Sequence, residues 1–204
     1  MIRLSDFDTL IFDFGGVILD IDPDLSRRKF AEMLGIEKAH KLEEEQLPQL
    51  YETGRISRAE FVERINRIAG TSFSDAEIIT AWNAMLLNYK QPRIEWIKKL
   101  NATHQLLMLS NTNDAHFEYF HKKLIDEFGV TFYQLFDHVY LSHEMGMLKP
   151  SLEIYEAVIE EQRLNLQRTL FIEDTARNVE GAQKVGLQTL LIPRNGEFYK
   201  FFEE

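Results

Sequence analysis

Five short apolar runs, separated by amphipathic helical segments, limit the folds open to this chain more than any other feature. The runs are Thr9–Phe12, Gln105–Leu109, His138–Leu141, Thr169–Ile172 and Gln188–Ile192. Short continuous apolar runs are typical of strands that are buried on both faces. Helical patterns near 92–100, 114–127, 151–163 and 176–185 precede the last four runs. This alternation predicts an α/β fold, a doubly wound parallel sheet with helices on both faces.

A long stretch without a convincing strand separates the first run from the second. It carries four helical patterns, over 24–34, 38–52, 57–69 and 74–88. Ser57-Arg58-Ala59-Glu60 has the pattern of a capping box, so we expect a helix to start there. Pro48 predicts a bend or a restart in the helix before it. Because a connection of this length is not a loop, we expect a four-helix cap over residues 19–88, inserted into a core of residues 1–18 and 89–204.

Polar residues follow four of the apolar runs, at the points where the strands should end. They are Asp13 after the first, Ser110 and Asn111 after the second, Lys149 in the loop after the third, and Glu173 and Asp174 after the fourth. Parallel strands place their carboxyl ends at one edge of the sheet, where ligands bind in such folds. We therefore expect these side chains to converge.

The residue types at this edge indicate a phosphoryl-transfer site. Asp13, Glu173 and Asp174 would repel one another if all were ionised, and Mg²⁺ relieves such repulsion with the oxygen ligands that it prefers. A hydroxyl at Ser110 and backbone N–H groups before a helix suit a phosphate group. Lys149 adds a positive charge. Such a set can stabilise the charge that develops on a transferring phosphoryl group.

Four motifs in this order resemble the haloacid dehalogenase superfamily. They are IFDFGG, LSNTN, GMLKP and FIEDTARN, each following a predicted strand. The resemblance covers essentially the whole chain, and the helical insertion matches the cap of that family. More narrowly, FDFGGVILDID, ETGRIS and YLSHEMGMLKP are similar to the bacterial α-D-glucose-1-phosphate phosphatases.

The resemblance implies a role for each residue of the edge. Asp13 would be the nucleophile that forms an aspartyl-phosphate, which water then hydrolyses. The Mg²⁺ ligands would be Asp13, the carbonyl of Gly15, Asp174 and, directly or through water, Glu173. Ser110 and the Asn111 amide would hold the phosphoryl oxygens, and Lys149 would neutralise charge and orient Asp13.

Gly15 is a departure from the family's usual pattern. Most phosphatases of this family carry an aspartate there, which acts as general acid and then as base, and its loss costs about 10²–10⁴ in rate. The resembled glucose-1-phosphate phosphatases also have glycine. The departure favours a leaving group that needs little protonation, such as that of a sugar 1-phosphate or an acyl phosphate. Asp20 and Asp22 are candidates for the missing base, although no pattern places them at the site.

Three further segments carry expectations. Glu52-Thr53-Gly54-Arg55 forms a turn in the cap, and the resemblance implies that such turns face the active site, so Arg55 or Glu52 is expected to contact the substrate. His116 and His121 are expected at the surface of a helix. The aromatic residues of Glu197–Glu204 pack either on the body of the protein or on another subunit, and the sequence does not determine the oligomeric state.

Charge and composition restrict the partners. Lys and Arg number 23 and Asp and Glu number 33, which gives a net charge of −10. The electrostatic field of a negatively charged protein disfavours binding to nucleic acid and to anionic membranes. Neither a signal peptide nor an apolar run long enough for a membrane helix is present, so a cytoplasmic protein is expected. The absence of cysteine excludes thiolate chemistry and disulfides.

The function predicted from these features is a magnesium-dependent phosphatase acting on a small phosphorylated metabolite, preferably a sugar phosphate such as glucose 1-phosphate. A 2-haloacid dehalogenase is an alternative, but such enzymes of this family need no magnesium and lack the paired acids Glu173 and Asp174. A phosphomutase would need the group that Gly15 removes. A binding or regulatory protein that keeps the fold and turns over poorly is the alternative from another class, supported only by Gly15.

Overall fold

The computed structural model describes residues 1–203 and is built on a parallel sheet of five strands. In spatial order the strands are β6 (His138–Leu141), β5 (Gln105–Ser110), β2 (Thr9–Phe12), β7 (Thr169–Glu173) and β8 (Gln188–Leu191). All four neighbouring pairs are parallel. The five predicted strands are therefore confirmed, with no bound wrong by more than one residue.

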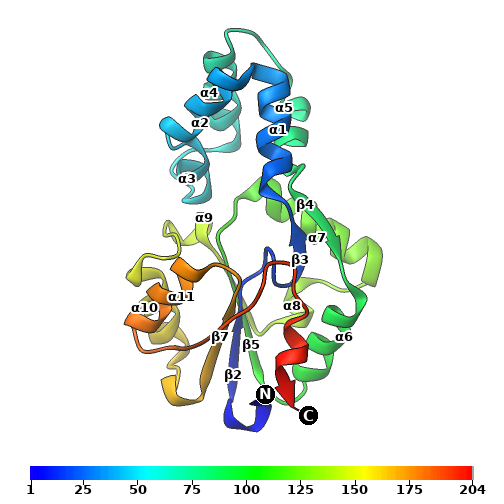
Figure 1. Ribbon diagram of the computed structural model, residues 1–204, viewed down its shortest axis with the longest axis vertical. Coiled ribbons are helices and arrows are strands. Elements are labelled where there is room, and N and C mark those ends of the chain that lie inside the picture. Colours follow the sequence, from blue (N-terminus) through cyan, green and yellow to red (C-terminus); the bar gives the residue numbers. More distant parts are fainter. Residues whose placement is uncertain (204) are drawn as a thin grey trace.

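Helices cover both faces of this sheet (Figure 1). One face carries α6 (Gln91–Leu100), α7 (Asp114–Phe128) and α8 (Phe132–Leu135), and the other carries α10 (Leu152–Gln162) and α11 (Ala176–Lys184). Successive residues of a strand point to opposite faces, so Leu10 and Phe12 join the cluster with α6 and α7, whereas Ile11 joins the cluster with α10 and α11. The predicted doubly wound α/β fold is confirmed.

The C-terminal aromatic segment packs on the body of the protein. Phe198 is fully buried, and its ring lies 5.5 Å from that of Phe12 and 5.2 Å from that of Trp96. The last strand, β9 (Phe202–Glu203), pairs in parallel with the first, β1 (Ile2–Arg3). Of the two alternatives for this segment, the described residues adopt the intramolecular one.

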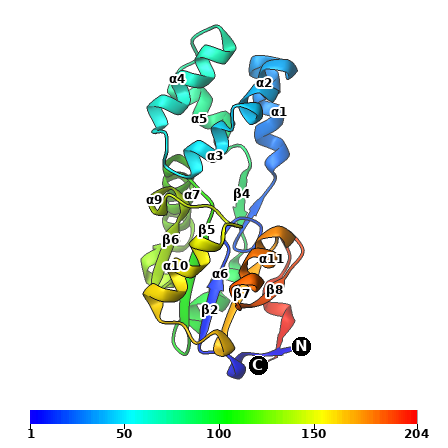
Figure 2. The ribbon, with the colours of Figure 1, turned by 90° about the vertical axis from the view of Figure 1, so that its left-hand side faces the viewer.

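Beyond the carboxyl ends of the strands lies a group of helices with its own apolar cluster (Figure 2). The helices are α1 (Pro23–Leu34), α2 (Ile36–Glu44), α3 (Leu47–Glu52), α4 (Arg58–Ala69) and α5 (Asp75–Asn83). The capping box at Ser57 is present. The restart expected near Pro48 is confirmed: the helical pattern over 38–52 is two helices, with Gln46 at a left-handed φ of 54° and Pro48 in the first turn of α3. The cap therefore has five helices where four were expected.

The expectation of no strand in the insertion is also wrong. Strand β3 (Leu19–Ile21) pairs with β4 (Leu86–Tyr89) in an antiparallel ribbon that carries the chain into the cap and back. Leu19, Leu86 and Tyr89 pack in the apolar cluster of the core. The domain division at 18/19 and 88/89 stays a prediction.

His116 is not the surface residue that its place in a polar helix suggested. Its side chain is buried and stacks on Trp82 of the cap, with the ring centroids 4.8 Å apart. The surface of α7 that carries it faces α5. Within residues 1–203, no helix combines the length and the apolar composition that crossing a membrane requires.

Candidate active site

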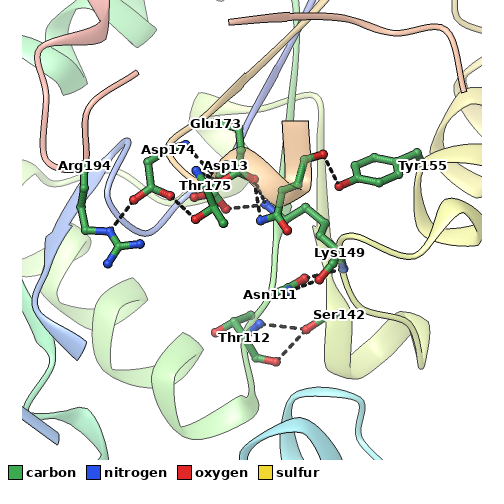
Figure 3. A network of polar contacts seen from close by, with 11 residues as sticks. Asp13, Asn111, Thr112, Ser142, Lys149, Tyr155, Glu173, Asp174, Thr175 and Arg194 are labelled. Atoms are coloured by element: carbon green, nitrogen blue, oxygen red, sulfur yellow. Dashed lines mark hydrogen bonds and ion pairs between the residues drawn. The ribbon is translucent and has the colours of Figure 1, made fainter. Parts of the chain in front are cut away.

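The predicted residues meet at the carboxyl ends of β2, β5 and β7 (Figure 3). Asp13 follows β2 directly and is only 7% exposed, and its backbone N–H donates to the carbonyl of Ile172 at 2.9 Å. Glu173 is the last residue of β7 and Ser110 the last of β5, and both are buried. The parallel register of the sheet thus places these polar side chains at one edge.

Lys149 lies at the centre of the site. Its Nζ donates to Asp13 Oδ1 at 2.6 Å and to Glu173 Oε2 at 2.8 Å, and its side chain is almost fully buried. Burial alone would lower the pKa of Lys149, but the two carboxylates outweigh it and raise the pKa above its usual value. The two acids therefore favour the charged form of Lys149.

Asn111 holds the loop that carries this lysine. Its side-chain NH₂ donates to the Lys149 carbonyl, and its side-chain oxygen accepts from the Lys149 N–H, both at 2.9 Å. The side chain of Asn111 therefore fixes the lysine loop, and its predicted contact with phosphate through the backbone amide stays a prediction.

Glu173, which ends β7, and Asp174, which follows it, differ in their hydrogen-bond partners. Glu173 Oε1 accepts from the backbone N–H groups of Asp174 and Thr175 at 3.1 Å each, and Oε2 accepts from Asn178 at 3.0 Å in addition to Lys149. Asp174 accepts from the Thr175 hydroxyl at 2.8 Å and from Arg194 Nε at 2.6 Å. Since Glu173 already has four donors, Asp174 has more lone pairs free for a cation.

The carboxylates of this edge fit a magnesium ion. Ligand oxygens of Asp13, Glu173 and Asp174 lie within 4.8 Å of one another. Burial, followed by the charge of Glu173, raises the pKa of Asp13 to about 7, against the lowering effect of Lys149. A cation beside Asp13 would favour its ionised form, and an all-oxygen donor set is the one that Mg²⁺ prefers.

Gly15 and Gly16 form the turn that follows Asp13. A Cβ on Gly15 would lie 3.2 Å from Cδ1 of Ile21, and a Cβ on Gly16, whose φ is +86°, would lie 2.4 Å from Asp174 Oδ2. The backbone therefore passes directly against Asp174, which only glycine at position 16 allows. The role of the Gly15 carbonyl as a metal ligand stays a prediction.

Arg194 is a site residue that the sequence reasoning missed. It follows β8 at the same edge of the sheet, so the strand-end argument that selected the other residues would also have selected this one. Its guanidinium is held by Asp174, and Asn195 beside it hydrogen-bonds both backbone groups of Ile21. The loop after β8 thus links the acidic cluster to the strand that leads into the cap.

The two candidates for the missing base are engaged elsewhere. Asp20 pairs with the buried Arg93 at 2.7 Å and with Lys90 at 3.1 Å. Asp22 is the N-cap of α1 and accepts from the Asp24 N–H. The carboxylates of Asp20 and Asp22 are therefore both hydrogen-bonded to groups outside the acidic cluster.

The two cap residues expected near the substrate point to different spaces. Glu52 lines a cavity of about 620 Å³ between α1, α2 and α3, together with Arg177 of α11. Arg55 lines a separate cavity of about 470 Å³ beside Met147 and Leu148 of the lysine loop. The structure thus brings six of the predicted residues to one edge, namely Asp13, Ser110, Asn111, Lys149, Glu173 and Asp174. Glu52 and Arg55 line cavities whose walls include none of these six residues.

Comparison with known proteins identifies relatives of the same architecture. The chain is 28% identical over 191 residues to the D-ribitol-5-phosphate phosphatase of Bacteroides thetaiotaomicron, and the match covers 92% of both chains. A HAD family enzyme of the same organism, in complex with magnesium and inorganic phosphate, is 29% identical with a TM-score of 0.87, over 97% of this chain and 100% of that one. A predicted HAD-like family hydrolase from Porphyromonas gingivalis is 28% identical with a TM-score of 0.87, over 95% and 94% of the two chains.

A family model also matches most of the chain. Residues 7–186 match the haloacid dehalogenase-like hydrolases, and this range contains the whole acidic cluster, the lysine loop and the cap. The enzyme class expected from the four motifs is confirmed. The chain belongs to the haloacid dehalogenase-like hydrolases.

Proposed function

We propose that this hydrolase is a magnesium-dependent phosphatase that acts on a small sugar or polyol monophosphate through an aspartyl-phosphate on Asp13. The observation that carries the proposal is the buried contact of Asp13 with Lys149, beside Glu173 and Asp174. A nucleophilic carboxylate, a fixed cation and two further acids are the groups that hydrolysis of a phosphate monoester needs.

Each residue has a task in the proposed reaction. Asp13 attacks phosphorus, so that a bond forms between its carboxylate oxygen and phosphorus while the bond to the substrate oxygen breaks. That oxygen leaves with the bonding electron pair and takes a proton from solvent water. Lys149 keeps Asp13 oriented through its 2.6 Å contact and offsets negative charge on the phosphoryl group. Ser110 binds a phosphoryl oxygen from the end of β5. Water then attacks the aspartyl-phosphate and releases phosphate.

Asp13, Asp174 and the Gly15 carbonyl would hold Mg²⁺, with Glu173 acting directly or through water. The bound ion neutralises charge that develops on the phosphoryl oxygens. Arg194, which is partly exposed, balances Asp174 and adds positive charge at the mouth of the site.

The substrate class rests on two independent likenesses. The resembled motifs are those of α-D-glucose-1-phosphate phosphatases, and the relative that matches along 92% of the chain is named for D-ribitol 5-phosphate. Both substrates are monophosphates of polyhydroxylated carbon chains. Glucose 1-phosphate is therefore one member of the proposed class, and ribitol 5-phosphate is another. The glycine at position 15 favours the first, because ribitol 5-phosphate releases an ordinary primary alcohol whose oxygen needs a proton.

A panel assay tests the proposal. Phosphate release is measured from glucose 1-phosphate, ribitol 5-phosphate and phenyl phosphate, with magnesium and with a chelator. We expect hydrolysis that needs magnesium and disappears in Asp13→Asn, while the control Asp126→Asn, an exposed carboxylate on α7, keeps wild-type activity. Hydrolysis that survives in Asp13→Asn would refute the mechanism. Tight phosphate binding without any hydrolysis would favour the regulatory alternative.

A further inference from the structure

Arg194 lies against the turn that contains Gly15, the position at which most phosphatases of this family carry an acid. A Cβ on Gly16 would lie 3.2 Å from Cγ of Arg194, so the arginine side chain passes next to this turn. Its Nε donates to Asp174 Oδ2 at 2.6 Å, and Figure 3 shows the guanidinium on the opposite side of Asp174 from Lys149. The turn that lacks an acid therefore has a cation as its neighbour.

The backbone that carries this cation, the β8 loop (residues 194–196), is held from two directions. The N–H of Asn195 donates to the carbonyl of Gly16 at 2.7 Å. Arg93, whose side chain is fully buried, donates from Nη2 to the carbonyls of Asn195 and Gly196 at 2.6 and 3.0 Å. Arg194 therefore starts from a backbone that is fixed relative to the turn after Asp13.

The β8 loop also closes the space that an acid at position 15 would need. The side chain of Asn195 accepts from the Ile21 N–H at 2.9 Å and donates to the Ile21 carbonyl at 3.0 Å. Cδ1 of Ile21 would lie only 3.2 Å from a Cβ on Gly15. An aspartate at this position would have to displace Ile21, so the charge on the leaving oxygen has to be met by another group.

The direction of attack places the leaving oxygen away from Lys149. In phosphoryl transfer the attacking and leaving oxygens lie roughly in line, with phosphorus between them. Asp13 is only 7% exposed, and the buried Lys149 Nζ contacts its Oδ1, so Lys149 lies on the side of the attacking oxygen. The leaving oxygen lies on the far side of phosphorus, toward solvent. The side chain of Arg194, which is 47% exposed beside Asp174, approaches the site from that side.

Arg194 has donors left for such an oxygen. Within residues 1–203 its Nε is engaged by Asp174, whereas neither of its Nη groups donates a hydrogen bond. A guanidinium stays charged in proteins, so it supplies positive charge and hydrogen bonds but no proton. Such a group suits a leaving oxygen that is acidic enough to depart as an anion.

We propose that the Nη groups of Arg194 bind the leaving oxygen of the substrate and stabilise the negative charge that develops on it, in the absence of an acid at Gly15. The inference rests on the proposed phosphatase function. As the bond to phosphorus breaks, the leaving oxygen keeps the electron pair, accepts hydrogen bonds from Arg194 and takes its proton from solvent water. The substrate class narrows to monophosphates of acidic hydroxyl groups, of which the anomeric hydroxyl of a sugar 1-phosphate is one.

Two aryl phosphates test this role. Phenyl phosphate and 4-nitrophenyl phosphate differ in the acidity of the phenol that they release, and 4-nitrophenol, the stronger acid, needs less stabilisation as it leaves. The measured quantity is the ratio of kcat/KM for 4-nitrophenyl phosphate to that for phenyl phosphate. Because kcat/KM compares free enzyme and substrate with the transition state, it reports formation of the aspartyl-phosphate on Asp13 and not the later hydrolysis that both substrates share.

Substitution of Arg194 should change this ratio. We expect Arg194→Met to lower kcat/KM for phenyl phosphate by roughly 10- to 100-fold, the effect of losing a hydrogen bond to a charged oxygen, and to lower that for 4-nitrophenyl phosphate much less. Arg194→Lys keeps a positive charge and should restore part of the phenyl phosphate activity. Arg168→Met is the matched control, because Arg168 is 42% exposed and pairs with Asp8 at 2.6 Å, just before β7 at the other end of the strand. It should leave both values unchanged.

The possible outcomes separate this inference from the function on which it rests. A wild-type ratio in Arg194→Met, with hydrolysis that still needs magnesium and Asp13, would overturn the inference alone. An equal loss for both substrates, with weaker magnesium binding in calorimetry, would also overturn it and assign Arg194 to the orientation of Asp174. If wild type hydrolyses neither aryl phosphate and neither glucose 1-phosphate nor ribitol 5-phosphate, the proposed function fails and the inference fails with it. Thermal unfolding of each variant shows whether the fold is retained.

Discussion

Gly16→Ala is the substitution whose effect on the metal site can be worked out most directly from the structure. The added methyl group would lie 2.4 Å from Asp174 Oδ2, roughly 1 Å closer than an ordinary non-bonded contact. The backbone cannot yield easily, because the Gly16 carbonyl accepts from the Asn195 N–H at 2.7 Å. Asp174 must therefore turn away from its place beside Asp13.

Two penalties follow, and they can be separated. An alanine at a φ of +86° costs about 1–2 kcal/mol of stability, which for a chain of this size lowers the Tm by roughly 2–4 °C for each kcal/mol. Displacement of Asp174 removes a proposed metal ligand, and disturbing even the partners of such ligands lowers metal affinity by about 10- to 100-fold. We therefore expect the magnesium concentration for half-maximal activity to rise by at least that factor.

Gly129→Ala is the matched control. Gly129 has a similar φ of +66°, but no atom lies within 4 Å of the position that its Cβ would take. It should share the loss of Tm and leave the magnesium dependence of hydrolysis unchanged. If magnesium titrations of the two variants superimpose, the placement of Asp174 in the metal site is refuted.

Three further outcomes are expected. Lys149→Met should lower kcat by about 10²–10³ in steady-state assays without loss of the folded circular dichroism spectrum; activity within a few-fold of wild type would exclude Lys149 from the reaction. Burial lowers the pKa of His116 to about 4 from 6.5, so the folded state binds fewer protons at this residue than the unfolded state, and this contribution to stability falls as the pH drops below about 6.5. Between pH 7 and pH 5, the free energy of unfolding measured with urea should therefore change less favourably in wild type than in His116→Gln, by about 2 kcal/mol. Equal changes in the two proteins would contradict this. Phe198→Ala should lower the free energy of unfolding by about 3–5 kcal/mol, and a loss below about 1 kcal/mol would show that the C-terminal segment contributes little to the core.

The sequence predicts the sheet well, and it predicts which polar residues gather at one edge of the sheet, for a physical reason. Central parallel strands are buried on both faces, so their continuous apolar runs stand out, as in Leu106–Leu109, and the polar residue that ends each run marks the edge of the sheet. The same rule extends to Arg194 after β8, which was missed because no motif contains it.

The cap and its junction with the core depend on contacts that no local pattern shows. Strands β3 and β4 are short, and they pair with each other rather than with the central sheet, so the apolar residues of 74–88 were interpreted as one helix. His116 is buried because α5 of the cap covers it. The Ser142 hydroxyl lies 2.7 Å from the carbonyl of Glu52, the last residue of α3, and so joins the core to the cap. Each of these is set by tertiary packing between segments distant in the sequence.

The antiparallel pairing of β3 with β4 has a consequence for how chains of this kind diversify. The polypeptide leaves the core and returns to it through adjacent hydrogen-bonded strands, so the two ends of the inserted segment stay close together whatever lies between them. Insertions with neighbouring ends are the ones that a host fold tolerates. Loops and helices grafted at this two-stranded stem can therefore be exchanged or lengthened in evolution, or by an engineer, while the register of the host sheet stays untouched.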